Sequence, residues 1–222
     1  MGAGERESDA MTLRRALSLV VFQALFLFVA RLALSAWQGQ PENALAPSAS
    51  TFATLALTSV VTVGVVWWGS IRGRGWSDAG WRFERPVQTL ALALGVALVC
   101  LAIVVALVAA AGGSASEVLE AMARPSLAQR AVYAGIGAQA AFTEETLFRG
   151  NLLGALEKRL PWWPAVLVMA VSFSLYHLIP SPLGLAAKFV FGVVFALARR
   201  WSGSLVAPAL GHFLFWTVAG AA

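Results

Sequence analysis

Charged residues are scarce in this chain of 222 residues. They make up 12% of the sequence, whereas 59% is hydrophobic and the mean hydropathy is +0.75. A soluble domain needs about a quarter of its residues charged, because its surface faces water. A surface with half that charge must face lipid, which excludes a soluble enzyme and predicts a polytopic helical membrane protein.

Cysteine and nucleophile motifs are also nearly absent. The single cysteine, Cys100, allows no internal disulfide. No Gly-x-Ser-x-Gly motif occurs, so no serine or cysteine nucleophile motif competes for the chemistry. The formal net charge of +5 would suggest a nucleic-acid partner in a soluble chain. Here we interpret the positive charge as a membrane topology signal and expect no nucleic acid to bind.

Seven apolar stretches stand out along the chain, most of them near the roughly 20 residues that a spanning helix needs. They cover residues 14–37, 50–71, 87–111, 128–156, 162–179, 182–200 and 203–221. The sequence therefore predicts an all-α transmembrane bundle of about seven spans.

Lysine and arginine are frequent in every second connection between the stretches and scarce in the others. Counting the arginines at the ends of the stretches, eleven belong to the N-terminal segment and to the second, fourth and sixth connections, against two in the others. Positive residues are retained on the cytoplasmic side, so we predict a cytoplasmic N-terminus and an external C-terminus. The segment 72–88, with Trp76, Trp81 and Phe83 among its arginines, is interpreted as interfacial and on the cytoplasmic face.

The first stretch has an alternative interpretation as a signal peptide. Its first two residues, Arg14 and Arg15, precede an apolar run, and residues 33–35 loosely resemble a cleavage site between small residues. Cleavage there would leave the basic second connection on the cytoplasmic side all the same.

Ionisable side chains inside spans are costly unless they are paired or face a polar cavity, so each is a functional candidate. Away from their ends, the stretches contain Arg31, Glu144, Glu145, Arg149, His177, Lys188 and His212. This set includes both histidines of the chain and the two acids that lie well within spans.

The two glutamates should have different roles. Glu145 and Arg149 are four residues apart and neighbours on one helix face, where they can form an ion pair. Glu144 points about 100° away and lacks that partner. A free carboxylate in a low-dielectric site suits a general base, although both glutamates could simply hold helices together.

Each histidine alone would be explained by a hydrogen bond between helices. Phe173 lies one turn before His177 and can position its ring, and His212 follows small residues that let another helix approach. With Glu144 they form a set that can activate water against an amide, with His212 stabilising the oxyanion.

These residues resemble the CAAX-processing protease and bacteriocin-processing (CPBP) family of intramembrane proteases, which includes the prenyl-protein endopeptidase Rce1. The Glu-Glu-x-x-x-Arg motif matches at residues 144–149, and Phe-x-x-x-His matches at residues 173–177. A third motif leads into His212, but Trp216 stands where the family commonly has Asn or Asp. The resemblance covers about residues 128–218.

The resemblance implies a glutamate-type endopeptidase without a cofactor. Glu144 and His177 would activate water and His212 would bind the oxyanion; the supporting residues would be Glu145, Arg149, Phe173 and Trp216. The substrate would be a membrane-anchored or lipidated protein. The chain itself would be a multi-pass protein located in the bacterial inner membrane. Within the family, the myxosortase subgroup is a candidate to which the resemblance would extend. Residues 1–127 would carry the first spans and residues 128–222 the catalytic core of one integrated membrane domain.

Three alternatives stay open. Glu144, His177 and His212 could be the ligands of a catalytic zinc, although the chain has no His-Glu-x-x-His helix. A proton-coupled transporter could use the same intramembrane charges. A non-catalytic scaffold or immunity-type relative could keep the fold, and Trp216 is the residue that favours it.

Depth in the membrane is inconsistent in this scheme. Glu144 falls near the middle of its stretch, whereas His177 lies three residues before Pro180, near the outer edge of its own. Either one boundary is wrong or residues 180–182 turn back into the membrane.

Overall fold

Helices make up the regular structure of the described residues, 11–38 and 48–220, in a computed structural model. The α-helices are α2 (Leu13–Gln38), α3 (Ala49–Val66), α4 (Pro86–Ala110), α5 (Ala115–Ala123), α6 (Leu127–Glu144), α7 (Leu153–Leu156), α8 (Trp162–Tyr176), α9 (Pro182–Ser202) and α10 (Val206–Ala219). Two π-helices, η2 (Trp67–Ile71) and η3 (Glu145–Leu152), continue α3 and α6.

The predicted helical membrane fold is confirmed. Within residues 11–38 and 48–220, four helical segments are long and apolar enough to cross a membrane: they lie in α2, in α3 with η2, in α4 and in α9. The helices α8 and α10 are apolar but shorter. The remaining predicted span corresponds to α6, η3 and α7 in succession.

Three details differ from the sequence prediction. The stretch predicted over 162–179 ends as a helix at Tyr176, and the last one begins at Val206 rather than at residue 203. A short helix, α5, follows α4 in a connection where none was predicted. Ser114 begins α5 with a capping box, in which its side chain and that of Glu117 bond each other's backbone N–H groups.

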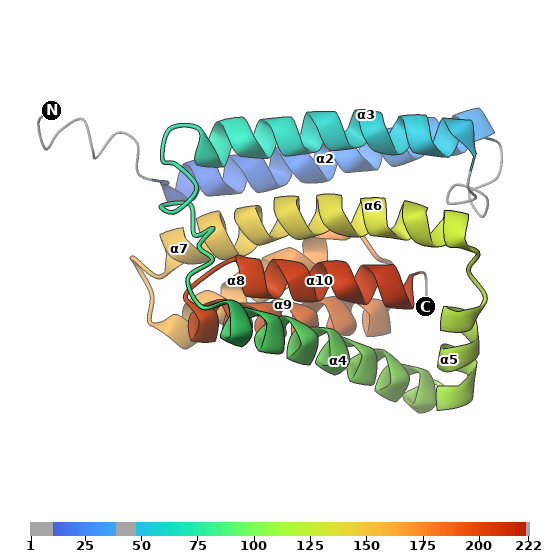
Figure 1. Cartoon of the computed structure of the whole chain (residues 1–222). Helices are drawn as coiled ribbons and strands as arrows, with labels where there is room; N and C mark the ends of the chain where they lie inside the picture. Colours follow the sequence, from blue (N-terminus) through green and yellow to red (C-terminus); the bar gives the residue numbers. More distant parts are fainter. Residues whose placement is uncertain (1–10, 39–47, 221–222) are drawn as a thin grey trace, which may run out of the picture.

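Helix α6 is central to the bundle. Figure 1 shows α6 between the pair α2 and α3 on one side and α10 and α4 on the other. Helix α10 packs against both α4 and α6, and α9 packs against α8 and α4. The N-terminal helices therefore pack directly on the C-terminal ones, and the residues of α6 are surrounded by other helices.

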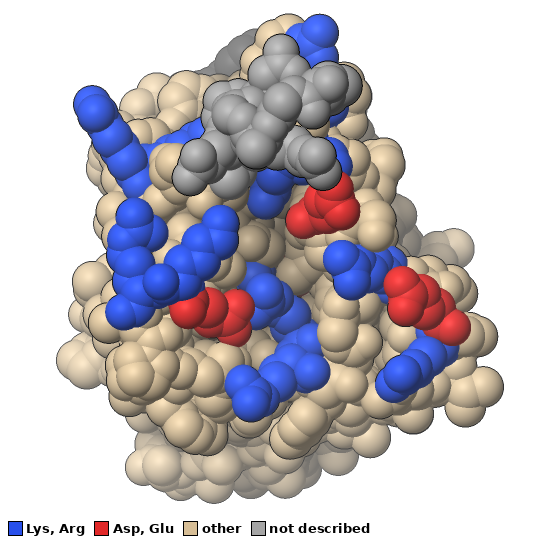
Figure 2. Space-filling view, turned by 90° about the vertical axis from the view of Figure 1, so that its left-hand side faces the viewer, with Lys and Arg blue, Asp and Glu red and all other residues tan. Residues whose placement is uncertain are grey.

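The connections predicted to be cytoplasmic meet at one end of the bundle. The backbone N–H of Leu205, before α10, donates to the carbonyl of Gly80 at 2.8 Å. Arg199 near the end of α9 pairs with Glu157 after α7 at 3.1 Å. Figure 2 shows this end, over which lysine and arginine side chains gather. Which side of the membrane this end faces stays a prediction.

Small residues let the last helix approach its neighbour, as the sequence predicts. A Cβ atom added at Gly211 of α10 would lie 2.6 Å from Val96 Cγ1 and 2.8 Å from the carbonyl oxygen of Ala93, both on α4. Contacts this close leave no room for a side chain. The residue that follows, His212, is therefore held by a contact between two helix backbones.

We predict that Gly211→Ala destabilises the protein by about 1–3 kcal/mol, because the new methyl group overpacks against α4. Gly95→Ala is the matched control on α4, where an added Cβ meets nothing within 4 Å. The control should be neutral or slightly stabilising. Thermal unfolding of both purified variants in detergent checks this, and equal unfolding temperatures would contradict the close packing.

Candidate active site

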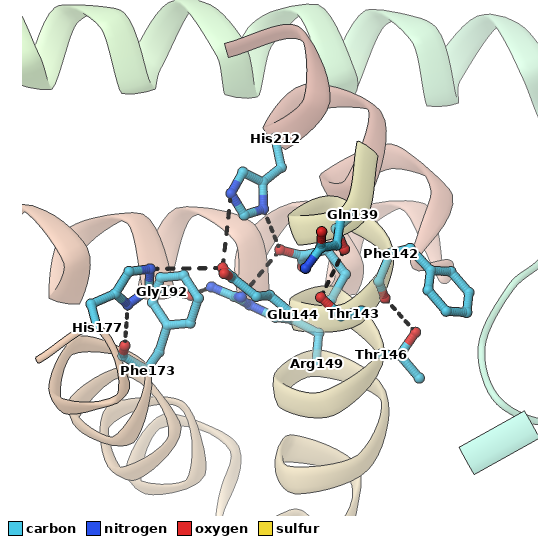
Figure 3. A network of polar contacts seen from close by, with 11 residues as sticks. Gln139, Phe142, Thr143, Glu144, Thr146, Arg149, Phe173, His177, Gly192 and His212 are labelled. Atoms are coloured by element: carbon cyan, nitrogen blue, oxygen red, sulfur yellow. Dashed lines mark hydrogen bonds and ion pairs between the residues drawn. The ribbon is translucent and has the colours of Figure 1, made fainter. Parts of the chain in front are cut away.

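Three predicted side chains from three helices meet around one carboxylate oxygen. His177 Nε2 lies 3.8 Å from Glu144 Oε2, and His212 Nε2 lies 3.9 Å from the same atom (Figure 3). Glu144 is 7% exposed and His212 3% exposed. The structure thus brings together the residues that sequence analysis selects as catalytic, in a largely buried site.

The depth inconsistency is resolved by the length of α8. The helix has 15 residues, and so extends for only about 22 Å, less than the roughly 30 Å of a hydrocarbon core. His177 caps this short helix, and Leu178 then turns the chain with a left-handed φ of 52°. The predicted boundary at residue 179 was wrong, and His177 lies level with Glu144.

The tautomer of His177 follows from its backbone contact. Nδ1 lies 2.7 Å from the carbonyl oxygen of Phe173, which can only accept a hydrogen bond. The neutral ring therefore carries its proton on Nδ1 and directs the lone pair of Nε2 toward Glu144. The Phe173 ring meets the imidazole edge-on, with 4.7 Å between centroids, which holds the ring in the orientation that the motif predicts.

His212 is fixed by the other glutamate. Its Nδ1 lies 3.2 Å from Glu145 Oε1, and its ring stacks on Phe195 with centroids 4.8 Å apart. An ionised Glu145 accepts a hydrogen bond, so Nδ1 is the donor and Nε2 of the neutral ring carries a lone pair. An oxyanion-binding role consequently requires His212 to hold two protons.

The ion pair of Glu145 and Arg149 is confirmed and fully buried. Arg149 Nη1 lies 3.1 Å from Glu145 Oε1, and both side chains are 0% exposed. The guanidinium also donates to the carbonyl of Gly192 at 3.2 Å. It lies 4.2 Å from the ring centroid of Phe173 and 4.9 Å from that of Phe195. This pair joins α8 and α9 to the helix that carries Glu144.

Glu144 differs from Glu145 as the sequence predicts. Its buried Oε2 has no hydrogen-bond partner among the described residues, whereas Glu145 Oε1 bonds Arg149 and His212. One carboxylate is tied into the packing, and the other faces two imidazole nitrogens without a bond. The free carboxylate is the one available to a reacting molecule.

A π-helix begins directly after Glu144, where the sequence predicted a regular helix. Its eight residues, 145–152, contain the rest of the Glu-Glu-x-x-x-Arg motif. Around its start, the Thr143 hydroxyl donates to the Gln139 carbonyl and the Thr146 hydroxyl to the Phe142 carbonyl, both at 2.7 Å. Threonine bonds of this kind often bend helices. Single π turns inside α-helices are frequent at functional sites.

The segment 72–88 contacts α6 and η3, which the sequence did not predict. Trp81 Nε1 donates to Thr146 Oγ1 at 3.1 Å, and the Trp81 ring stacks on Phe142 with centroids 5.4 Å apart. Trp76 adds a further ring contact to Phe142 at 6.0 Å. The interpretation of residues 72–88 as an interfacial segment was incomplete, because the segment also packs against the helix beside Glu144.

A second polar contact ties the same segment to η3. Arg74 Nη2 donates to the side-chain oxygen of Asn151 at 2.7 Å, and the Asn151 amide donates to the Ser70 hydroxyl at 2.6 Å. Burial lowers the pKa of the Arg74 guanidinium, and the charge of Arg15 lowers it further. Asn151 is 0% exposed, so this network fixes the far end of the π-helix.

Trp216 takes part in packing between helices. A Cβ at Gly137 of α6 would lie 2.7 Å from Trp216 Cβ, so the two helices meet closely at this pair. In the described part of the chain no hydrogen bond joins the indole to Glu144 or to either histidine. Trp216 therefore supplies helix contact where the family commonly has an amide or carboxyl group.

The family resemblance is confirmed by comparison with known proteins. Residues 126–218 match the family model of the type II CAAX prenyl endopeptidase Rce1-like proteins. This segment contains the three clustered residues and the buried ion pair. This part of the chain is thus similar to the Rce1-like family, which is a family of membrane proteases.

One curated relative is an uncharacterized 24.3 kDa protein of Escherichia coli. It is 37% identical over 76 residues, which are 33% of this chain and 35% of that protein. The chain thus spans about a third of the length of the curated relative it matches. No solved structure matches the chain significantly. The myxosortase subgroup stays a prediction.

We predict that breaking the buried ion pair from one side is severe. Glu145→Gln should leave the Arg149 charge unpaired at 0% exposure and destabilise the protein by about 3–5 kcal/mol. The double variant Glu145→Gln, Arg149→Met should be less destabilised than the single one, because it removes the unpaired charge. Thermal unfolding in detergent measures both. Additive losses would show that the two residues act independently.

Proposed function

We propose that this protein is an intramembrane endopeptidase that hydrolyses a peptide bond in a membrane-anchored or lipidated protein. The observation that carries the proposal is the meeting of His177 and His212 at a single oxygen of Glu144, inside the segment that matches the protease family. Besides the substrate, the lipid bilayer is a partner of the protein. Its proposed location is the bacterial inner membrane, which it crosses several times.

Water is the nucleophile in this proposal. The separation of 3.8 Å between His177 Nε2 and Glu144 Oε2 is too long for a hydrogen bond. A water molecule alongside both atoms can donate one hydrogen to the carboxylate and one to the imidazole lone pair. Its oxygen is then free to attack a peptide carbonyl carbon while Glu144 takes up the proton.

His212 serves the next step. Attack by water moves the carbonyl electrons onto the oxygen, and Nε2 of a doubly protonated His212 donates a hydrogen bond to that oxyanion. As the C–N bond breaks, the protonated Glu144 gives its proton to the leaving amine. The products are a new carboxyl terminus and a new amino terminus, and both Glu144 and the histidines return to their starting states.

No cofactor enters this proposal. Within residues 11–38 and 48–220, no group of three or more His, Cys, Asp or Glu side chains is placed so that it could hold a metal ion. The nitrogen atoms that face Glu144 instead suit proton transfer and hydrogen bonding. Zinc held by Glu144, His177 and His212 remains the alternative to be tested.

We predict that Glu144→Gln and His177→Ala each lower cleavage by at least about 100-fold, as expected for loss of a general base, while the protein still accumulates in the membrane. Mass spectrometry of protein termini, in cells expressing each chain at equal levels, would show termini that depend on Glu144. Full activity of either variant would contradict the mechanism. Identical termini in all cells, with folded variants, would favour a scaffold or transporter.

Elemental analysis of the purified active protein separates the two versions of the mechanism. We expect less than 0.1 zinc per chain, as an order of magnitude, and activity that survives a chelator, because water is activated by the side chains alone. One zinc per chain that disappears together with activity would overturn the account without metal.

A further inference from the structure

A hollow lined by arginines opens at the end of the bundle that Figure 2 shows. Its volume of about 290 Å³ is close to the roughly 300 Å³ at which ligand pockets begin. One wall is the segment that leads into α4, with Arg82, Glu84 and Arg85, and the other is the turn from α9 to α10, with Arg200 and Trp201. Among the described residues that line it, three are cations and one is an acid. We call it the arginine hollow.

Hydrogen bonds between the two walls hold the arginine hollow in shape. The backbone N–H of Arg82 donates to the Ser204 hydroxyl at 3.3 Å, and Gln88 Nε2 donates to the carbonyl of Trp201 at 3.2 Å. These bonds join segments that are far apart in the sequence. The hollow is therefore formed before any ligand binds, which lowers the entropic cost of binding.

The positive charge of the hollow is not neutralised by the protein. No ion pair within residues 11–38 and 48–220 includes Arg82, Arg85 or Arg200. Arg82 Nε donates to the carbonyl of Ser77 at 3.1 Å, and the Arg200 guanidinium lies 4.3 Å from the ring centroid of Trp162. These contacts orient two of the guanidinium groups and leave most of their N–H donors free. Repulsion among three like charges falls when an anion binds between them.

A second hollow beside it lacks this excess of charge. The two share Arg82, but Asp78 also lines the second one, and its other arginine, Arg199, is already paired with Glu157 at 3.1 Å. The unneutralised cations are therefore concentrated in the arginine hollow. Guanidinium groups match the geometry of phosphate oxygens, to which each can donate two hydrogen bonds at once.

The surroundings of the arginine hollow favour a lipid over a free anion. Helix α4 exposes large apolar side chains from its first turn, at Val87, Leu90 and Leu94, with Val87 82% exposed. Their spacing of three and four residues places them on one side of the helix. Trp201 is 61% exposed, and tryptophan rings favour the level of the lipid headgroups. The hollow thus lies where headgroup phosphates and the first part of the acyl chains meet the protein.

We propose that the arginine hollow is a binding site for the phosphate of an anionic phospholipid. Arg82, Arg85 and Arg200 donate hydrogen bonds to the phosphate oxygens, and the acyl chains lie against the exposed side of α4. Basic pockets between membrane helices bind lipid headgroups in this way. The ligand is a lipid of the membrane rather than the proposed protease substrate. Because it contacts both walls, the bound lipid stabilises the folded protein.

Titration of the purified protein with dioleoyl phosphatidylglycerol in a neutral detergent tests the site. Native mass spectrometry counts the bound lipids, and thermal unfolding records the stabilisation. We expect saturable binding and a higher unfolding temperature, and at least about tenfold weaker binding of dioleoyl phosphatidylcholine, which has no net charge. Binding should weaken as salt is raised, because salt screens partly exposed charges.

Arg85→Gln and Arg200→Gln should each weaken phosphatidylglycerol binding about fivefold, as for the loss of one arginine beside an anionic headgroup. Lys158→Gln is the matched control, because it removes one positive charge from an exposed residue that lines neither hollow. The control should change binding less than about twofold, since a charge outside the hollow is largely screened. Unfolding temperatures without added lipid show that each variant is folded.

Equal binding of the two lipids would overturn the proposal, and so would equal losses in Lys158→Gln and the two hollow variants, because general surface charge would then explain the effect. Stabilisation by inorganic phosphate equal to that by phosphatidylglycerol would assign the hollow to a free anion and overturn the lipid as its ligand. Cleavage that depends on Glu144 is a separate measurement, so failure of the lipid site leaves the proposed protease function standing.

Discussion

The fully buried pair of Glu145 and Arg149 is the interaction on which the rest of the site depends. The two side chains are 0% exposed, with Arg149 Nη1 3.1 Å from Glu145 Oε1, and each makes a second contact. Glu145 fixes the ring of His212 from α10, and Arg149 bonds the backbone of α9 and lies against the rings of Phe173 and Phe195. One ion pair therefore holds four helical elements in register around Glu144.

The different roles of the adjacent residues Glu144 and Glu145 follow from this ion pair. The Glu145 carboxylate is bonded to a guanidinium and an imidazole and holds the structure together, whereas the preceding residue, Glu144, is left free to face the histidines. A low-dielectric interior strengthens the interaction of the paired carboxylate with its partners. It also makes the unpaired carboxylate more reactive. The same reasoning explains why His177 presents a lone pair while its other nitrogen is bonded to the Phe173 carbonyl.

Much of the fold was predictable from the sequence, because the solvent is lipid. Long apolar runs locate the helices, and the spacing of Glu145 and Arg149 specifies a pair on one helix face. The identity of the clustered residues was predictable as well, since both histidines and the two buried acids are rare within spans. The pattern of basic connections matches the single end at which they meet, although the orientation in the membrane stays a prediction.

The remaining features depend on tertiary contacts that hydropathy does not encode. The π-helix after Glu144 changes which residues share a face, and no sequence rule specified it. The early end of α8 at Tyr176 sets the depth of His177, yet the apolar run continues beyond it. Trp81 looked like a membrane anchor because its hydrogen bond to Thr146 spans 65 residues of sequence.

The central claim is that Glu144 activates water against a peptide bond. Membranes containing the wild-type protein, incubated in water labelled with oxygen-18, would test it most directly by mass spectrometry of new carboxyl termini. The account predicts new termini that carry one labelled oxygen from the first turnover, none of them formed by Glu144→Gln, and no label in the Glu144 side chain. Label in that side chain would show that Glu144 attacks the substrate itself, and would contradict the account.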